Sequence, residues 1–150
     1  MRIVIAEAGI EYKTASDRKI ETPEDASKAV SELAQMDREA FAVLNLDAQN
    51  GLQSADIVTV GLVDESLIEP RECFRQAVRA NASAIILVHN HPTGDTTPSA
   101  EDIRITRQLV AAGKVLDIHV IDHIIIAKGA TGAGIKTTSM RNLGLVDFAA

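Results

Sequence analysis

The sequence contains no tryptophan, few aromatic residues of any kind and a single cysteine. Aromatic residues make up only 3% of the chain, so we expect an aliphatic core. The single cysteine, Cys73, excludes a disulfide within the chain and a zinc site built from several cysteines. Because Cys73 lies in an apolar-patterned segment, we expect it to be a reduced, buried thiol rather than a nucleophile.

An excess of basic residues and long apolar runs are also missing. The formal net charge is −6, which argues against a broad nucleic-acid-binding surface. Arg71, Arg75 and Arg79 are a local exception, since their spacing forms a stripe along a helix, either as a solvated face or as a contact for an anionic substrate. No apolar run reaches 18 residues and the N-terminus lacks a signal peptide pattern, so we expect no membrane span and a cytoplasmic protein.

The patterns that are present predict one domain of mixed α/β class. A chain of 150 residues with 46% hydrophobic residues can bury a core of its own. Periodicity predicts strands over 2–6, 39–47, 55–61, 84–88 and much of 115–126, and helices over 22–36, 70–80 and 99–113. Asn50-Gly51 predicts a hairpin between two strands. Because this hairpin interrupts the alternation of strands and helices, we expect a mixed sheet flanked by helices.

Local signals predict the ends of these elements. Thr22 can cap the first helix, Ser99 can cap the third, and Gly113 is expected to end the third. The stretch 11–22 is charged and rich in turn residues. The segment 129–134 is glycine-rich, and we expect it to be mobile.

The run His89-Asn90-His91-Pro92 is the strongest chemical signal in the sequence. Two histidines two residues apart on a strand point to the same face, because side chains alternate with a period of two. Asp102, in the first turn of the next expected helix, can return to supply a third ligand. Three protein ligands with an open fourth position are typical of a catalytic zinc, which activates water to attack a carbonyl. Ligand type alone leaves iron, cobalt and nickel open.

Each further site residue has a structural interpretation beside the functional one. Ser99 and Asp102 also form the pattern of a capping box, and capping and metal binding by Asp102 are compatible. Ser99 can either donate a hydrogen bond to a developing oxyanion or only cap the helix. Glu39 is our candidate general base, although it can also be a solvated residue at a strand start. Asp122 and His123 either orient a metal ligand or form a buried polar pair.

These residues resemble the motif of the JAMM (MPN-plus) metallopeptidases, which is a Glu, a long gap, His-x-His, seven residues and Ser-x-x-Asp. The sequence is more similar still to the RadC-like JAB-domain branch of that superfamily, over roughly residues 22–144. The stretches that carry this similarity include Glu69–Phe74, His89–Asp95, Thr97–Asp102, Thr106 and Asp122–Ile125.

The resemblance implies a role for each residue of the motif. It implies that His89, His91 and Asp102 bind zinc, that Glu39 is the base and that Ser99 stabilises the tetrahedral intermediate. It also implies a mixed sheet with helices around it, as in cytidine-deaminase-like architectures. The RadC-like JAB domain would cover 22–150, after a short N-terminal strand or extension at 1–21. Relatives of known activity cleave peptide or isopeptide bonds, so a protein or peptide, including a ubiquitin-like conjugate, is the expected substrate.

Two other functions compete with this one. The first is a RadC-like module in DNA repair, recombination or mobile-element biology without peptidase turnover, and the second is a different metal-dependent hydrolysis. RadC-like proteins usually carry an N-terminal helix–hairpin–helix region, and only about 21 residues precede the first expected helix here. That difference and the acidic charge argue against nucleic acid as a partner, whereas the intact motif favours the hydrolase.

Overall fold

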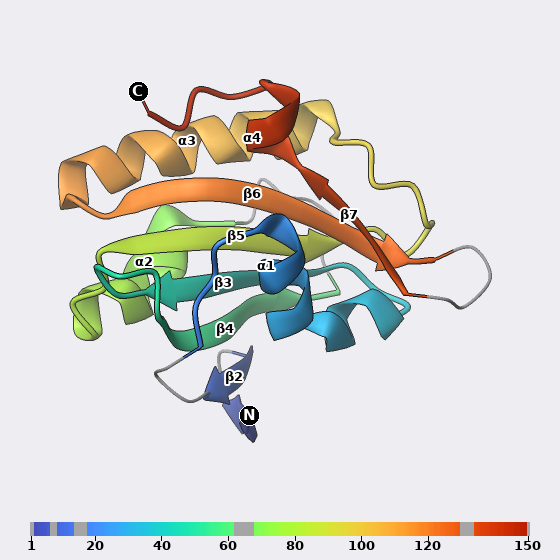
Figure 1. Ribbon diagram of the computed structural model, residues 1–150, viewed down its shortest axis with the longest axis horizontal. Coiled ribbons are helices and arrows are strands. Elements are labelled where there is room, and N and C mark those ends of the chain that lie inside the picture. The colour runs from blue at the N-terminus through green and yellow to red at the C-terminus, as the bar shows by residue number, and fades with distance from the viewer. Residues whose placement is uncertain (1, 7–8, 14–17, 62–67, 130–133, 150) are drawn as a thin grey trace.

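The computed structural model describes residues 2–6, 9–13, 18–61, 68–129 and 134–149. Its strands are β1 (Arg2–Ala6), β2 (Gly9–Lys13), β3 (Ala40–Leu46), β4 (Leu52–Val60), β5 (Ala84–Asn90), β6 (His119–Lys128) and β7 (Ile135–Ser139). Its helices are α1 (Pro23–Ala29), the 3-10 helix η1 (Ser31–Gln35), α2 (Pro70–Arg79), α3 (Ala100–Leu116) and α4 (Met140–Leu143). Helices cover both faces of one mixed sheet (Figure 1), which confirms the predicted fold class.

The sheet contains one parallel pair among antiparallel neighbours. Across the described residues its strand order is β1-β2-β4-β3-β5-β6-β7. Strands β3 and β4 form the hairpin that Asn50-Gly51 predicts, and Asn50 has a positive φ of 63°. Strands β5 and β6 are parallel and are joined by α3, as a crossover connection requires. None of the described helices is long and apolar enough to cross a membrane.

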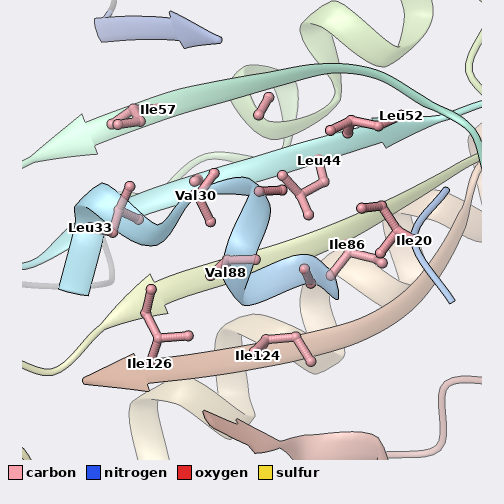
Figure 2. Close-up of a cluster of buried hydrophobic side chains, with 14 of the residues drawn as sticks. Ile20, Val30, Leu33, Leu44, Leu52, Ile57, Ile86, Val88, Ile124 and Ile126 are labelled. Carbon is pink, nitrogen blue, oxygen red and sulfur yellow. The ribbon is translucent and has the colours of Figure 1, made fainter. Parts of the chain in front are cut away.

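The two faces of the sheet carry different cores. One face packs against α1 and η1 through an aliphatic cluster that includes Leu33, Leu44 and Val88 (Figure 2). The other face packs against α2, α3 and α4, and it holds all three phenylalanines of the chain: Phe41, Phe74 and Phe148. Both cores are therefore largely aliphatic, as expected, and the three phenylalanines lie in the second one.

Cys73 belongs to the second core, as expected. Its residue is only 2% exposed, and burial raises the pKa of the thiol to about 12. The expected burial is confirmed, and the raised pKa favours the protonated thiol at neutral pH, which argues against a nucleophilic role. On the same helix, Arg71 and Arg75 are largely exposed and pair with Glu69 and Glu72, which favours the solvated-face interpretation of the arginine stripe.

The first helix is shorter than predicted. Thr22 caps α1 as expected, because its side chain accepts a hydrogen bond from the backbone N–H of Asp25. The α-helix then ends at Ala29, where Val30 leaves helical geometry, and η1 follows and buries Leu33. The prediction of one helix over 22–36 was wrong because α- and 3-10 helices both bury residues three or four positions apart.

The end of α3 was also predicted wrongly. The helix continues past Gly113 to Leu116 and ends at Asp117, which has a left-handed φ of 58°. A Cβ atom on Gly113 would lie 2.4 Å from the carbonyl oxygen of Ile118, so glycine is required there by the close return of the chain. As a result β6 begins at His119, and Val115 and Leu116 are helical rather than extended.

Smaller differences concern the hairpins. Part of the stretch 11–22 is extended, because β2 pairs with β1 and β4. Strand β4 begins at Leu52, three residues before the predicted 55. Strand β1 agrees with the prediction over 2–6. In the glycine-rich segment 129–134, residues 130–133 lie outside the described residues.

Candidate metal centre

Three elements meet at the end of β5 and bring the predicted site residues together. His89 lies within β5 and His91 directly follows it, so both rings project to the side of α3. The antiparallel register pairs Phe41 of β3 with His89, which places Glu39 beside His91. Asp102 lies in the first turn of α3, which starts after the loop that leaves β5.

The two histidines face each other with the same ring nitrogen. The Nε2 atoms of His89 and His91 lie 2.9 Å apart. One carboxylate oxygen of Asp102 lies 3.2 Å from the Nε2 of His89, and the other lies 3.3 Å from the Nε2 of His91. The structure thus brings together the three predicted ligands, although their role as ligands stays a prediction.

Glu39 also reaches this cluster. Its Oε1 lies 3.9 Å from the Nε2 of His91. Glu39, His89 and His91 each offer a ligand atom within 4.8 Å of the others, so the three could hold a metal ion. Glu39 is therefore placed either to bind the ion directly or to act from its open side.

Burial gives the cluster a closed side and an open side. The side chains of His89 and Asp102 are 0% exposed, whereas those of His91 and Glu39 are 13% and 29% exposed. The cluster is therefore reached from solvent past Glu39 and His91. His89 and Asp102 form the floor of the site.

His91 is oriented by the loop that follows it. Its Nδ1 lies 2.7 Å from the carbonyl oxygen of Asp95, so this nitrogen carries a proton and donates a hydrogen bond to that oxygen. The Nε2 of His91 consequently faces the cluster. The hydrogen bond with Asp102, together with the nearby negative charge, raises the pKa of His91. The site therefore attracts positive charge, which a proton or a metal ion can supply.

Ser99 and Asp102 form the capping box that their spacing predicts. The Ser99 hydroxyl oxygen accepts the backbone N–H of Asp102 at 3.0 Å, and the Asp102 carboxylate accepts the N–H of Ser99 at 2.8 Å. The cap thus orients the carboxylate toward the histidines. In accepting the N–H of Asp102, the Ser99 oxygen uses a lone pair, so its hydroxyl proton remains available for another hydrogen bond. That Ser99 donates this hydrogen bond to an oxyanion stays a prediction.

Asp122 and His123 have separate environments, because neighbouring residues of a strand alternate in direction. Asp122 accepts hydrogen bonds from the Ser139 hydroxyl and from the N–H of Arg141, and burial raises its pKa. It therefore anchors the junction of β7 and α4. His123 instead contacts His89, with its Nε2 2.7 Å from the Nδ1 of His89.

Asn90 also shapes the site, although no sequence pattern singled it out. Its side chain accepts the N–H of Ala40 at 2.6 Å and donates to the carbonyl oxygen of Arg38 at 2.9 Å. These two bonds bracket Glu39 and hold the start of β3 beside β5. The available signal was a polar residue at the end of an otherwise apolar strand, where burial requires hydrogen-bond partners.

Fold and site together define a mixed α/β domain with a histidine pair and two carboxylates at the end of a central strand. The sequence matches the RadC-like JAB domain over residues 20–145. The chain belongs to this family, which confirms the resemblance inferred from the motif.

Two similar proteins carry a family designation as their name. The chain is 45% identical over 134 residues to a UPF0758 protein of Syntrophomonas wolfei, which covers 86% of this chain and 54% of the relative. It is 47% identical over 108 residues to one of Desulfitobacterium hafniense, which covers 71% of this chain and 48% of the relative. The chain thus spans about half the length of the curated relatives it matches.

Proposed function

We propose that this domain is a zinc-dependent hydrolase that cleaves peptide, isopeptide or related amide bonds. The observation that carries the proposal is the convergence of the two Nε2 atoms and the Asp102 carboxylate within 3.3 Å of one another. Two imidazoles and a carboxylate form a ligand set that zinc accepts in catalytic sites, with the remaining position left open. When bound, the ion would supply a Lewis acid and lower the pKa of a water molecule.

The residues around this position would divide the remaining chemistry. Glu39, on the open side, would take the proton of the attacking water and return it to the leaving amine. The Ser99 hydroxyl would donate a hydrogen bond to the oxygen of the tetrahedral intermediate. Asp102 and His89 would hold the floor of the site in place.

For the substrate we propose a protein or peptide, with ubiquitin-like conjugates among the candidates. The negative net charge of −6 fits such a partner better than a nucleic acid. The reduced, buried thiol of Cys73 is compatible with the cytoplasm as the compartment.

Metal content of the purified protein tests the first half of the proposal. We expect about one zinc per chain in the wild type, as for a single site with three protein ligands. The His89→Ala variant should lose the zinc. The His119→Ala variant is the matched control, because His119 lies outside the site and contacts the carbonyl oxygen of Phe148. A wild type that stays free of metal after zinc is added back would overturn the proposal.

The Glu39→Gln variant tests the second half. It should keep zinc and lose hydrolysis by about 10²–10⁴-fold, because the amide cannot take a proton. The measurement is turnover of peptide and isopeptide libraries, with zinc content determined on the same samples. Full activity would exclude Glu39 as the base, and loss of zinc would make Glu39 a ligand instead.

A further inference from the structure

We propose that Thr106 and His123 form a hydrogen-bond relay that determines which nitrogen of His89 carries the proton, so that the Nε2 facing the metal centre is left unprotonated. The hydrogen bonds of the relay do not depend on the proposed function. Its role rests on that function, because the relay would prepare His89 to bind a metal ion. Its members come from α3, β6 and β5, so the arrangement exists only in the folded protein. Thr106 and His123 are positioning residues, because they act through His89.

Thr106 fixes which group donates and which accepts in each hydrogen bond of the relay. Its Oγ1 donates to the carbonyl oxygen of Asp102, one helical turn earlier, at 2.6 Å. The Sδ of Met140, at 3.7 Å, is a longer and weaker acceptor, so the bond to Asp102 uses the single hydroxyl proton of Thr106. The same oxygen lies 2.5 Å from the Nδ1 of His123, so it can only accept there, and His123 must carry a proton on Nδ1.

The protonation of His123 in turn fixes the donor role of His89. His123 is 0% exposed, and its two ring nitrogens contact Thr106 and His89, neither of which is a carboxylate, so burial favours the neutral ring with one proton. With that proton on Nδ1, the Nε2 of His123 is an acceptor. The Nδ1 of His89 lies 2.7 Å away and therefore donates to it.

The consequence appears on the other side of the His89 ring. A neutral His89 with a proton on Nδ1 presents the lone pair of Nε2 to His91 and Asp102, which is the form that a metal ion requires. Without the relay, His89 could protonate Nε2 and donate to Asp102 at 3.2 Å, and that proton would occupy the position of the metal.

Packing holds the two rings of the relay in register. Phe41 stacks on His89 with ring centroids 5.9 Å apart and meets the edge of His123 at 5.5 Å. Because all three rings are buried, the hydrogen bonds cannot be exchanged for bonds to bulk water. The relay also connects two of the proposed ligands, since it begins at the carbonyl oxygen of Asp102 and ends at His89.

Histidine tautomers in the metal-free protein test the relay directly. Long-range ¹H–¹⁵N spectra of protein labelled at histidine distinguish a protonated Nδ1 from a protonated Nε2. We expect Nδ1–H in both His89 and His123. A protonated Nε2 in His89 of the wild type would overturn the relay. Because this measurement needs neither metal nor substrate, its outcome is independent of the proposed hydrolase function.

Two pairs of variants test the consequence for metal binding. Thr106→Val removes the hydroxyl and keeps the shape, whereas Thr106→Ser keeps the hydroxyl. We expect Thr106→Val to weaken zinc binding by about 10–100-fold in a competition titration, with Thr106→Ser close to the wild type. Equal affinities in the two variants would contradict the relay.

The second pair covers the case in which Thr106→Val does not fold. In His123→Gln the amide oxygen can still accept from the Nδ1 of His89, whereas His123→Leu offers no acceptor. We expect the Gln variant to bind zinc more tightly than the Leu variant and to retain the Nδ1–H form of His89. If the two behave alike, the relay is wrong. If the wild type binds no zinc, the tautomer spectra alone decide the relay, and only the hydrolase proposal fails.

Discussion

At the scale of single residues, three neighbouring side chains at the end of β5 have different contacts. His89 and His91 turn toward Asp102, whereas Asn90 turns toward the neighbouring strand. The β3–β5 ladder ends at the pair of Phe41 and His89. Beyond that pair, the side chain of Asn90 supplies the hydrogen bonds to the backbone on both sides of Glu39. The position of the proposed base therefore depends on a residue that carries none of the proposed chemistry.

The Asn90→Ala variant should lower the free energy of unfolding by about 2–3 kcal/mol. It leaves the backbone N–H of Ala40 and the carbonyl of Arg38 without their buried partner, and each such group costs about 1–3 kcal/mol. Urea denaturation of the metal-free protein is the measurement. The control is Gln49→Ala in an exposed turn, which should change stability by less than about 0.5 kcal/mol. A change in Asn90→Ala as small as in the control would show that the bracket around Glu39 contributes little.

At the scale of elements, α3 connects the site to the core. Its capping box orients Asp102, and Thr106 follows one turn later beside His123. Ile105 and Leu109 are buried in the second core, and Gly113 lies at the close return of the chain toward β6. The helix therefore has a site-forming first turn, a core-forming middle and a last turn shaped by the following strand.

The Gly113→Ala variant should be destabilised by about 1–3 kcal/mol, as for overpacked core positions. Helix propensity alone predicts the opposite sign, a gain of about 1 kcal/mol. The new Cβ would lie 2.4 Å from the backbone oxygen of Ile118 and 3.3 Å from Phe74, so the backbone at Ile118 must shift to admit it. Equilibrium unfolding in urea decides between the two signs.

The control for this variant is Ala111→Gly at an exposed position of the same helix. It should cost about 1 kcal/mol, which reports the propensity term without a steric contribution. A Gly113→Ala protein more stable than the wild type would show that the close approach to Ile118 relaxes without cost.

At the scale of the whole molecule, one sheet separates two cores, and the candidate metal centre lies on the side of α3. Strands β3 and β5 contribute to both cores, so neither core can be lost without disturbing the strands that hold Glu39 and His89. A ligand bound at this position should consequently stabilise the entire fold and not only a loop.

Zinc added at about 100 times its dissociation constant should raise the free energy of unfolding by about 2.7 kcal/mol. For a chain of this size that corresponds to an increase in Tm of about 5–10 °C. Calorimetry with added zinc, followed by a chelator, measures the shift and its reversal. The His89→Ala variant should show no shift. A shift of equal size in this variant would place the binding elsewhere in the protein.

Prediction from the sequence succeeded where a signal was contained in one short segment. Period-two alternation placed His89 and His91 on one side, and the capping pattern placed Asp102 at the start of α3. Prediction failed where the local structure depends on contacts between two separate segments of the chain. Gly113 looks like a helix end until Ile118 returns beside it, and η1 cannot be separated from α1 by apolar spacing. The roles of Thr106 and Asn90 could not be assigned from the sequence, because His123 and the backbone on both sides of Glu39 lie on other elements.

The sequence by itself determined the mixed α/β class, the main strands and helices, the family and the residues proposed to bind a metal. The class and the elements depend on periodicity, turn residues and caps, which act over short segments, whereas the family rests on the resemblance of the motif from Glu39 to Asp102. Only the tertiary structure decided that Glu39 lies beside His91, that Asn90 brackets it, and that Thr106 and His123 orient His89. Those contacts arise from strand register and from the crossover of α3, which bring together residues up to about 50 positions apart. The side chains that would prepare the site therefore follow from packing, whereas the proposed ligands themselves are recognisable from their spacing.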